Sequence, residues 1–186
     1  MKNDTSKTIF TIPNLLSVFR MTLIPVFIWL YTTKQDYLMA AGILLFSGIT
    51  DIVDGYIARR FHMISNVGKV LDPAADKLTQ LATLYCLLTR FPAMQILMIL
   101  LIGKELFVGL TGLLVLKRTK EVFGSNWHGK VATFLLYAMI ILHVIWHDIP
   151  LRYSNFTIAL CVIMMTLSLV LYGVRNLRAL RNNMKA

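Results

Sequence analysis

Charged side chains are scarce in this chain of 186 residues, where Asp, Glu, Lys and Arg together make up 15% and hydrophobic residues 57%. Soluble domains carry about 25% charged residues, so this shortage argues against a soluble fold and favours a membrane protein. Acidic residues are the rarest, with 9 Asp and Glu against 19 Lys and Arg, which gives a formal net charge of +10. The length fits one domain, which we place at residues 1–186.

Cysteine is also nearly absent. Cys86 and Cys161 both lie in hydrophobic runs, where a free cysteine packs as a small apolar side chain, so no disulfide framework is expected. The four histidines form no recognisable metal-binding pattern, and we expect His128 in a cytoplasmic loop. The first hydrophobic run has no small-residue cleavage site, so we expect it to be retained as a membrane span.

Six hydrophobic stretches approach the roughly 20 residues that cross the hydrocarbon core of a bilayer. Their approximate bounds are Ile12–Tyr31, Tyr37–Ala58, Asp72–Leu88, Ala93–Leu116, Val131–His147 and Phe156–Val174. The third is long enough only if its acidic start lies at membrane depth and lines a wet cavity, and carboxylates at that depth are costly and usually functional. We therefore predict an all-α integral membrane protein with six transmembrane helices.

Basic residues cluster between the hydrophobic stretches, which disfavours a nucleic-acid-binding face on a soluble fold. The clusters follow the second and fourth stretches and occupy both ends of the chain. The opposite connections, around residues 34–36, 90–92 and 147–152, are short and poor in Lys and Arg. The positive-inside rule then places both termini in the cytoplasm. The polar segment 1–11 is expected to be an interfacial helix or a frayed end.

Four carboxylates lie within a short part of this apolar chain. Asp51 and Asp54 are three residues apart and Asp72 and Asp76 four apart, so each pair shares one face of a helix. Pro73 suits the first turn of the third span. Four carboxylates at one point repel one another, whereas divalent cations would make them a cage of oxygen ligands suited to phosphate chemistry. A salt-bridge network with nearby Arg and Lys is the structural alternative.

The whole segment from Asp51 to Asp76 reads D-x2-D-G-x2-A-R-x8-G-x3-D-x3-D. This pattern resembles the signature of the CDP-alcohol phosphotransferase family, integral-membrane enzymes that join a CDP-linked group to an alcohol. The chain is also similar to the bacterial phosphatidylglycerophosphate synthase and cardiolipin synthase branches of that family. This further similarity lies in Ile12–Leu15 with Arg20, in Leu71–Lys77 and in Gly129–Lys130.

The resemblance implies that the four signature aspartates, Asp51, Asp54, Asp72 and Asp76, bind two divalent metal ions, Mg²⁺ or Mn²⁺. It implies that Asp76 is the general base and that Asp72 is the second catalytic carboxylate. The CDP moiety would lie against small and basic residues of the signature and one residue of the first span: Gly55, Ala58, Arg59, Gly68 and Asn14.

An anionic acceptor needs basic groups for its phosphate, and the candidates are Lys104, Arg118 and Lys130. Lys104 and Glu105 interrupt an apolar stretch and require a polar environment. Typical phosphatidylglycerophosphate synthases carry an Arg-Glu pair here and a further arginine about two turns later, where this chain has Gly112. Arg20, near the cytoplasmic end of the first span, is a candidate to complete the substrate pocket.

The resemblance predicts transfer of the phosphatidyl group of CDP-diacylglycerol to glycerol 3-phosphate, giving phosphatidylglycerophosphate and CMP. The alternative is a cardiolipin synthase with phosphatidylglycerol as acceptor, and choline, inositol phosphate or serine acceptors are less favoured. A divalent-cation transporter is disfavoured, because the acids cluster at one end of two spans rather than at the bilayer midplane. We also expect a homodimer in a bacterial cell membrane, with the active site facing the cytoplasm.

Overall fold

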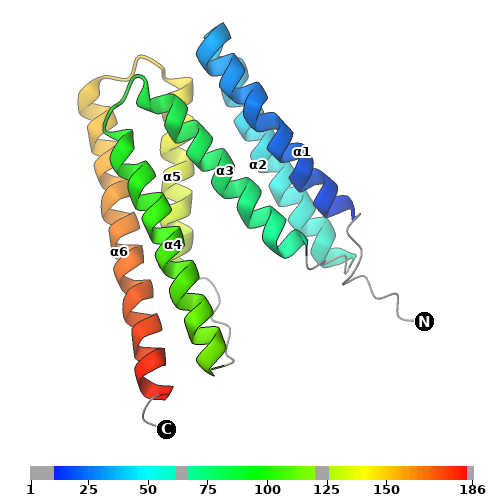
Figure 1. The fold of residues 1–186 in the computed structure, drawn as a ribbon. Coiled ribbons are helices and arrows are strands. Elements are labelled where there is room, and N and C mark those ends of the chain that lie inside the picture. Colours follow the sequence, from blue (N-terminus) through cyan, green and yellow to red (C-terminus); the bar gives the residue numbers. More distant parts are fainter. Residues whose placement is uncertain (1–10, 62–66, 120–125, 184–186) are drawn as a thin grey trace. The chain divides into compact units, whose positions relative to one another are not determined.

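The computed structural model describes residues 11–61, 67–119 and 126–183, and their regular structure is helical. The elements in order are α1 (Ile12–Trp29), the π-helical η2 (Leu30–Lys34), α2 (Tyr37–Arg60), α3 (Gly68–Leu88), α4 (Met94–Thr119), α5 (Trp127–Ile145) and α6 (Leu151–Asn183) (Figure 1). Each α-helix contains one of the six predicted hydrophobic stretches or most of it. Nearly all of the predicted interfacial segment, residues 1–10, lies outside the described residues.

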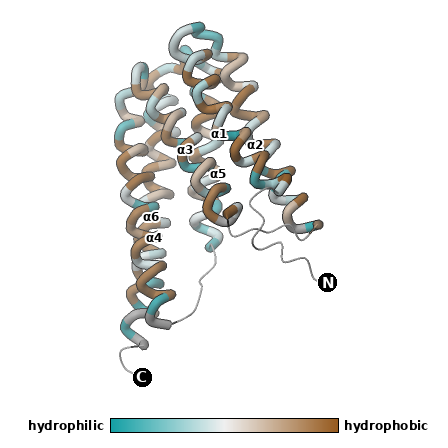
Figure 2. Tube along the Cα trace, turned by 45° about the vertical axis from the view of Figure 1, so that its right-hand side comes forward, coloured by the Kyte–Doolittle hydropathy of each residue, from teal (hydrophilic) through white to brown (hydrophobic). Residues whose placement is uncertain are grey.

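Membrane-spanning potential is confirmed for five helical segments of the described chain. They are long and apolar enough to cross a bilayer: Ile12–Lys34, Tyr37–Ala58, Met94–Lys117, Trp127–Ile145 and Leu151–Ala179. Figure 2 shows hydrophobic residues along much of the helices, as expected for surfaces that face lipid. Helix α3 does not meet the same criterion, since Asp72, Asp76 and Lys77 lie in its first half. The protein is therefore an all-helical membrane protein, and the sixth span stays a prediction.

Side-chain caps begin the first two long helices, and a tight turn joins them. The Thr11 hydroxyl caps α1 by accepting a hydrogen bond from the Asn14 N–H at 3.4 Å. After η2, Gln35 adopts a left-handed conformation with φ of 55°, which ends the helical run. The Asp36 carboxylate then caps α2 by accepting from the Met39 N–H at 3.0 Å. The two helices consequently run antiparallel and side by side (Figure 1).

The start of α3 differs from the sequence expectation. The helix begins at Gly68, one turn before Asp72, so Pro73 lies inside it rather than in its first turn. Proline has no N–H to donate to the carbonyl four residues earlier, so the helix loses one backbone hydrogen bond at that position. The helix still continues through Asp72 and Asp76, which keeps both carboxylates on one face.

The chain groups into two compact units. The first comprises the chain up to Leu87 together with Val144–His147, and the second comprises Leu88–His143 and the chain from Asp148 onward. In the first unit, buried side chains such as Phe27, Tyr31 and Leu84 form the core. Cys86 in the first unit and Cys161 in the second are both buried, as expected for small apolar side chains.

In the second unit, α4 and α6 lie side by side (Figure 1). Their contact includes a polar pair, in which the Asn176 side-chain amide donates to the Thr111 hydroxyl at 2.8 Å. The fully buried His143 bridges α5 and α6, since its Nε2 lies 2.9 Å from the Ser154 hydroxyl. Such hydrogen bonds hold apolar helices together where burial in lipid gives little driving force.

Candidate active site

Three helices of the first unit position the signature carboxylates. Asp51 and Asp54 lie in the last turns of α2, and Asp72 and Asp76 lie near the start of α3. Because α2 ends where α3 begins, both carboxylate pairs lie at the same end of the unit. Arg20 of α1 lies among them, with only 1% of its surface exposed.

The guanidinium of Arg20 binds three of the four carboxylates. Its Nη2 lies 2.6 Å from Asp54 Oδ2, and its Nη1 lies 2.9 Å from Asp76 Oδ1. The same Nη1 donates to Asp51 Oδ1. Carboxylates from α2 and α3 thus converge on one small planar group.

Asp72, the fourth carboxylate, is bound separately. Its Oδ1 accepts a hydrogen bond from the hydroxyl of Ser17, which is fully buried and lies one turn before Arg20 on α1. The Ser17 oxygen also lies 3.0 Å from the Pro13 carbonyl, but a hydroxyl has only one proton to donate. An ionised carboxylate is the stronger acceptor, so we assign the proton to Asp72.

The site carries more negative than positive charge. One guanidinium faces three carboxylates, so these four groups together carry a formal charge of −2. The Asp54 side chain is 3% exposed, whereas Asp51 and Asp76 keep 40% and 35% exposure. Arg20 and Asp54 therefore form the closed floor of the site, and Asp51 and Asp76 form its open rim.

The residues fit a divalent metal in their chemistry. In the described ranges, no three His, Cys, Asp or Glu side chains form a ready metal-binding group. The carboxylate oxygens of Asp51, Asp54 and Asp76 instead accept hydrogen bonds from Arg20. The donor atoms are all hard oxygens, and they converge from two helices. The three carboxylates carry two more negative charges than Arg20 balances. Such a set of ligands suits Mg²⁺ or Mn²⁺.

Other predicted CDP-binding residues lie near these ends of the helices. Gly55 and Ala58 are half-buried on α2, and Gly68 is buried at the start of α3. Asn14 is 5% exposed in the first turn of α1, on the helix that carries Arg20. The side chain of Arg59 lies outside the described part of the chain.

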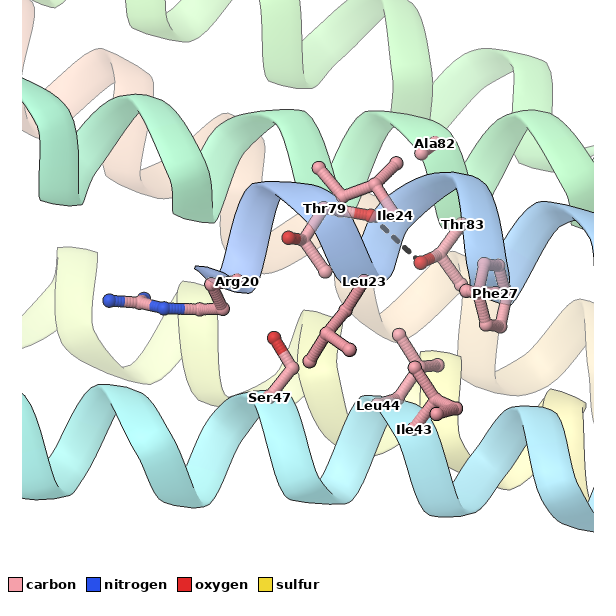
Figure 3. Close-up of a pocket in the computed structure, with 10 residues that line it drawn as sticks. All are labelled: Arg20, Leu23, Ile24, Phe27, Ile43, Leu44, Ser47, Thr79, Ala82 and Thr83. Carbon is pink, nitrogen blue, oxygen red and sulfur yellow. Dashed lines mark hydrogen bonds between the residues drawn. The ribbon is translucent and has the colours of Figure 1, made fainter. Parts of the chain in front are cut away.

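A small cavity of about 10 Å³ lies on the apolar side of Arg20, between α1, α2 and α3. Apolar side chains such as Leu23, Phe27 and Leu44 line most of it, and Figure 3 shows the Arg20 guanidinium pointing away from them. The Nε atom of Arg20 is buried without a hydrogen-bond partner in the described chain. Apolar packing therefore holds the stem of Arg20 and leaves its two terminal nitrogens to bind the carboxylates.

The predicted acceptor residues belong to the second unit. Lys104 is buried, and its Nζ pairs with Glu105 Oε1 at 2.9 Å, which supplies the polar partner expected for a charge within an apolar helix. Lys130 is exposed in the first turn of α5. Arg118 lies near the end of α4, and its side chain is outside the described residues.

The expectation that His128 lies in a loop is wrong. His128 belongs to the first turn of α5 and is 3% exposed. Its Nδ1 lies 3.1 Å from the Ser168 hydroxyl, and its Nε2 lies 3.2 Å from the side-chain amide nitrogen of Asn126. Arg175 donates to the Asn126 amide oxygen at 3.1 Å, which fixes the orientation of that amide. An amide nitrogen only donates, so the proton of neutral His128 is on Nδ1.

Sequence reasoning missed this polar network, although a signal was present. Ser168, Tyr172 and Arg175 recur at helical spacing in an otherwise apolar stretch, so they share one face of α6. The Tyr172 hydroxyl also accepts a hydrogen bond from the Asn126 N–H at 3.1 Å. A polar stripe on an apolar helix indicates a buried, hydrogen-bonded interface rather than lipid contact.

Comparisons with known proteins identify the family of this chain. The sequence profile of the family described as CDP-alcohol phosphatidyltransferase matches residues 10–173, which include the whole aspartate signature. The chain is 33% identical over 165 residues to the CDP-diacylglycerol–glycerol-3-phosphate 3-phosphatidyltransferase of Bacillus subtilis, covering 81% of this chain and 84% of that protein. It is 35% identical over 135 residues to the Rickettsia bellii protein of the same name, covering 70% and 74%.

A cardiolipin synthase (CMP-forming) of Streptomyces coelicolor is also similar, at 36% identity over 141 residues, covering 72% of this chain and 65% of that protein. The profile match begins just before α1 and extends into α6, and so includes α1, which carries Arg20, as well as the helices that carry the aspartates. This chain therefore belongs to the CDP-alcohol phosphatidyltransferase family.

Proposed function

We propose that this protein transfers the phosphatidyl group of CDP-diacylglycerol to glycerol 3-phosphate, giving phosphatidylglycerophosphate and CMP. The observation that carries the proposal is the convergence of Asp51, Asp54 and Asp76 at one point in a chain of this family. The names of the Bacillus and Rickettsia relatives support glycerol 3-phosphate as the acceptor.

The reaction exchanges one phosphorus–oxygen bond for another. The acceptor hydroxyl oxygen forms a bond to the phosphorus that carries diacylglycerol, and the bond from that phosphorus to the oxygen of CMP breaks. Asp76, on the open rim of the site, takes the proton of the hydroxyl. Two divalent cations held by Asp51, Asp54, Asp72 and Asp76 would neutralise the charge that develops on the diphosphate. The family generally uses such metals.

We propose separate sets of residues for the two substrates. We assign the CDP moiety to Asn14, Gly55, Ala58, Arg59 and Gly68, where small residues leave room and arginine donates to phosphate. We assign the acceptor phosphate to Lys104, Arg118 and Lys130, which supply positive charge for a dianion. Burial of Lys104 supports its assignment to the acceptor phosphate, because a buried ammonium group in a membrane helix seldom lacks a function.

We further propose one catalytic domain over residues 1–186, with six spans, both termini and the active site on the cytoplasmic side of a bacterial cell membrane. The single family match across residues 10–173, which belong to both compact units, supports one domain. Basic residues along the end of α6, Arg175, Arg178 and Arg181, support a cytoplasmic C-terminus. A homodimer is part of the proposal, as the family resemblance implies.

Cardiolipin synthesis is the second candidate function. The Streptomyces relative named as a cardiolipin synthase is as similar in identity as the phosphatidyltransferases. The chain also has Lys104-Glu105 and Gly112 where an Arg-Glu pair and a further arginine are expected for a glycerol 3-phosphate acceptor. Phosphatidylglycerol carries a single phosphodiester charge and needs less neutralisation.

Product analysis with purified full-length protein separates the two. Radiolabelled CDP-diacylglycerol is supplied with Mg²⁺ and either glycerol 3-phosphate or phosphatidylglycerol, and the lipid products are resolved. We expect phosphatidylglycerophosphate from glycerol 3-phosphate and little cardiolipin from phosphatidylglycerol. Cardiolipin as the main product would replace the first proposal by the second, and no product with either acceptor would overturn both.

A further inference from the structure

The guanidinium of Arg20 lies between carboxylates that the proposed metal site needs as ligands. Its Nη1 is shared by Asp51 Oδ1 from α2 and Asp76 Oδ1 from α3, the latter at 2.9 Å. A metal ion that joined the two helices would bind these same oxygens at about 2.0–2.6 Å. One nitrogen and one cation do not fit between the same pair of oxygens, so the two arrangements exclude each other.

We propose that Arg20 is a built-in counter-ion that stands in for the metal in the metal-free protein and is displaced when a divalent cation binds. The inference rests on the metal-dependent chemistry proposed above and assigns to Arg20 a positioning role. Arg20 holds the aspartates of α2 and α3 together until the metal replaces it. Its 1% exposure means that no bulk water screens the carboxylates from one another on that side.

The charge balance supports replacement rather than coexistence at the same oxygens. With Arg20 alone, the three carboxylates keep two uncompensated negative charges, which is enough to attract a divalent cation. The exposed rim at Asp51 and Asp76 gives the cation its entry, whereas Asp54 on the floor stays tied to Nη2 at 2.6 Å. Displacement therefore begins at Nη1, the nitrogen nearer the open side.

The experiment measures Mn²⁺ binding to full-length protein in detergent without substrates, using electron paramagnetic resonance of free Mn²⁺. The variants are Arg20→Met, which removes the charge, and Arg20→Lys, which keeps the charge but has one nitrogen where arginine uses two. Arg60→Met, which removes an exposed arginine that contacts Tyr56, is the matched control. Melting temperatures are recorded in excess chelator and in Mn²⁺.

We expect both Arg20 variants to bind Mn²⁺ at least about tenfold more tightly than wild type, and Arg60→Met to bind like wild type. In chelator, Arg20→Met should melt several degrees below wild type, and Mn²⁺ should raise its melting temperature by more than it raises that of wild type. If Arg20→Met does not fold, the Mn²⁺ affinity of Arg20→Lys relative to wild type still tests the inference. That variant retains the charge and changes only the hydrogen bonding.

Three results would overturn the inference. Wild-type affinity in Arg20→Lys with tighter binding in Arg20→Met would mean simple charge repulsion. Weaker binding in both variants would mean that Arg20 organises the carboxylates for the metal. No Mn²⁺ binding by any variant would show that these aspartates do not bind a divalent cation. The product assay distinguishes these failures from failure of the proposed function, because it does not depend on which cation holds the site before substrate binds.

Discussion

Asp54 and Asp76 accept hydrogen bonds from the two terminal nitrogens of Arg20, yet their surroundings differ. Asp54 is 3% exposed and faces only protein, whereas Asp76 is 35% exposed at the rim. A carboxylate that must take a proton from an incoming hydroxyl has to be reachable by that hydroxyl. Exposure therefore disfavours Asp54 as the base, and it leaves Asp76 and Asp51, at 35% and 40% exposure, within reach of the hydroxyl.

Asp76→Asn should lower kcat by about 10²-fold or more, the contribution typical of a general base, because an amide oxygen does not accept the proton. CDP-diacylglycerol binding should be partly retained, since the amide keeps the shape and one oxygen. The measurement is steady-state turnover together with donor binding. Asp148→Asn, at an exposed aspartate paired with Arg90, is the control and should behave as wild type. Near-wild-type turnover in Asp76→Asn would exclude Asp76 as base.

Arg118→Ala and Lys130→Ala should raise the apparent KM for glycerol 3-phosphate about tenfold to over a hundredfold. Loss of one charge-assisted contact to phosphate costs about 1.5–3 kcal/mol, which corresponds to that range. The KM for CDP-diacylglycerol should change little, and kinetics with each substrate varied in turn test this. Lys117→Ala removes an exposed lysine of α4 and serves as the control. Equal changes for both substrates would argue against an acceptor-phosphate role.

Helix packing in the second unit depends on one glycine. A Cβ atom at Gly129 of α5 would lie 2.4 Å from the Tyr172 hydroxyl oxygen and 3.1 Å from two ring carbons. Tyr172 of α6 is itself held, because its hydroxyl accepts from the Asn126 N–H and its ring lies 4.5 Å from that of His128. The absence of a side chain at Gly129 is what allows α5 and α6 to pack closely here.

Gly129→Ala should therefore destabilise the protein by about 1–3 kcal/mol, the range for overpacking, despite the better helix propensity of alanine. Thermal unfolding in detergent measures the effect. Gly112→Ala on α4 is the matched control, since its Cβ would meet nothing within 4 Å. Addition of Tyr172→Phe should restore part of the stability lost in Gly129→Ala, because it removes the oxygen of the closest contact. An unchanged melting temperature in Gly129→Ala would show that Tyr172 shifts at no cost.

At the scale of the whole molecule, activity should depend on divalent metal while folding should not. Excess chelator should abolish turnover, and Mg²⁺ or Mn²⁺ should restore it, because the ligands are all hard oxygens. The helical content of the chelated protein should remain, since Arg20 compensates part of the carboxylate charge. Circular dichroism and turnover on the same samples test both statements. Full turnover in chelator, with metal removal verified, would contradict the two-metal proposal.

Much of the fold was predictable from the sequence because its signals are local. Hydrophobic stretches give the positions of the helices, since their length reflects the thickness of a bilayer. The three- and four-residue spacings give the shared faces of Asp51 with Asp54 and of Asp72 with Asp76, since helix periodicity fixes them. Pro73 misled the placement of the α3 start, because a proline is accepted inside a helix where the surroundings tolerate one lost hydrogen bond.

The sequence by itself determined the helical membrane class and the family signature, because composition and periodicity are properties of neighbouring residues. It also predicted which residues carry the chemistry. Only the tertiary structure decided that Arg20 lies among aspartates 31 to 56 positions away, and that His128 is buried against Ser168. Such contacts depend on which helices pack together and at what height, and no local pattern encodes that choice. The difference between Asp54 on the floor and Asp76 on the rim has the same origin, since exposure is set by the neighbouring helices rather than by the residue itself.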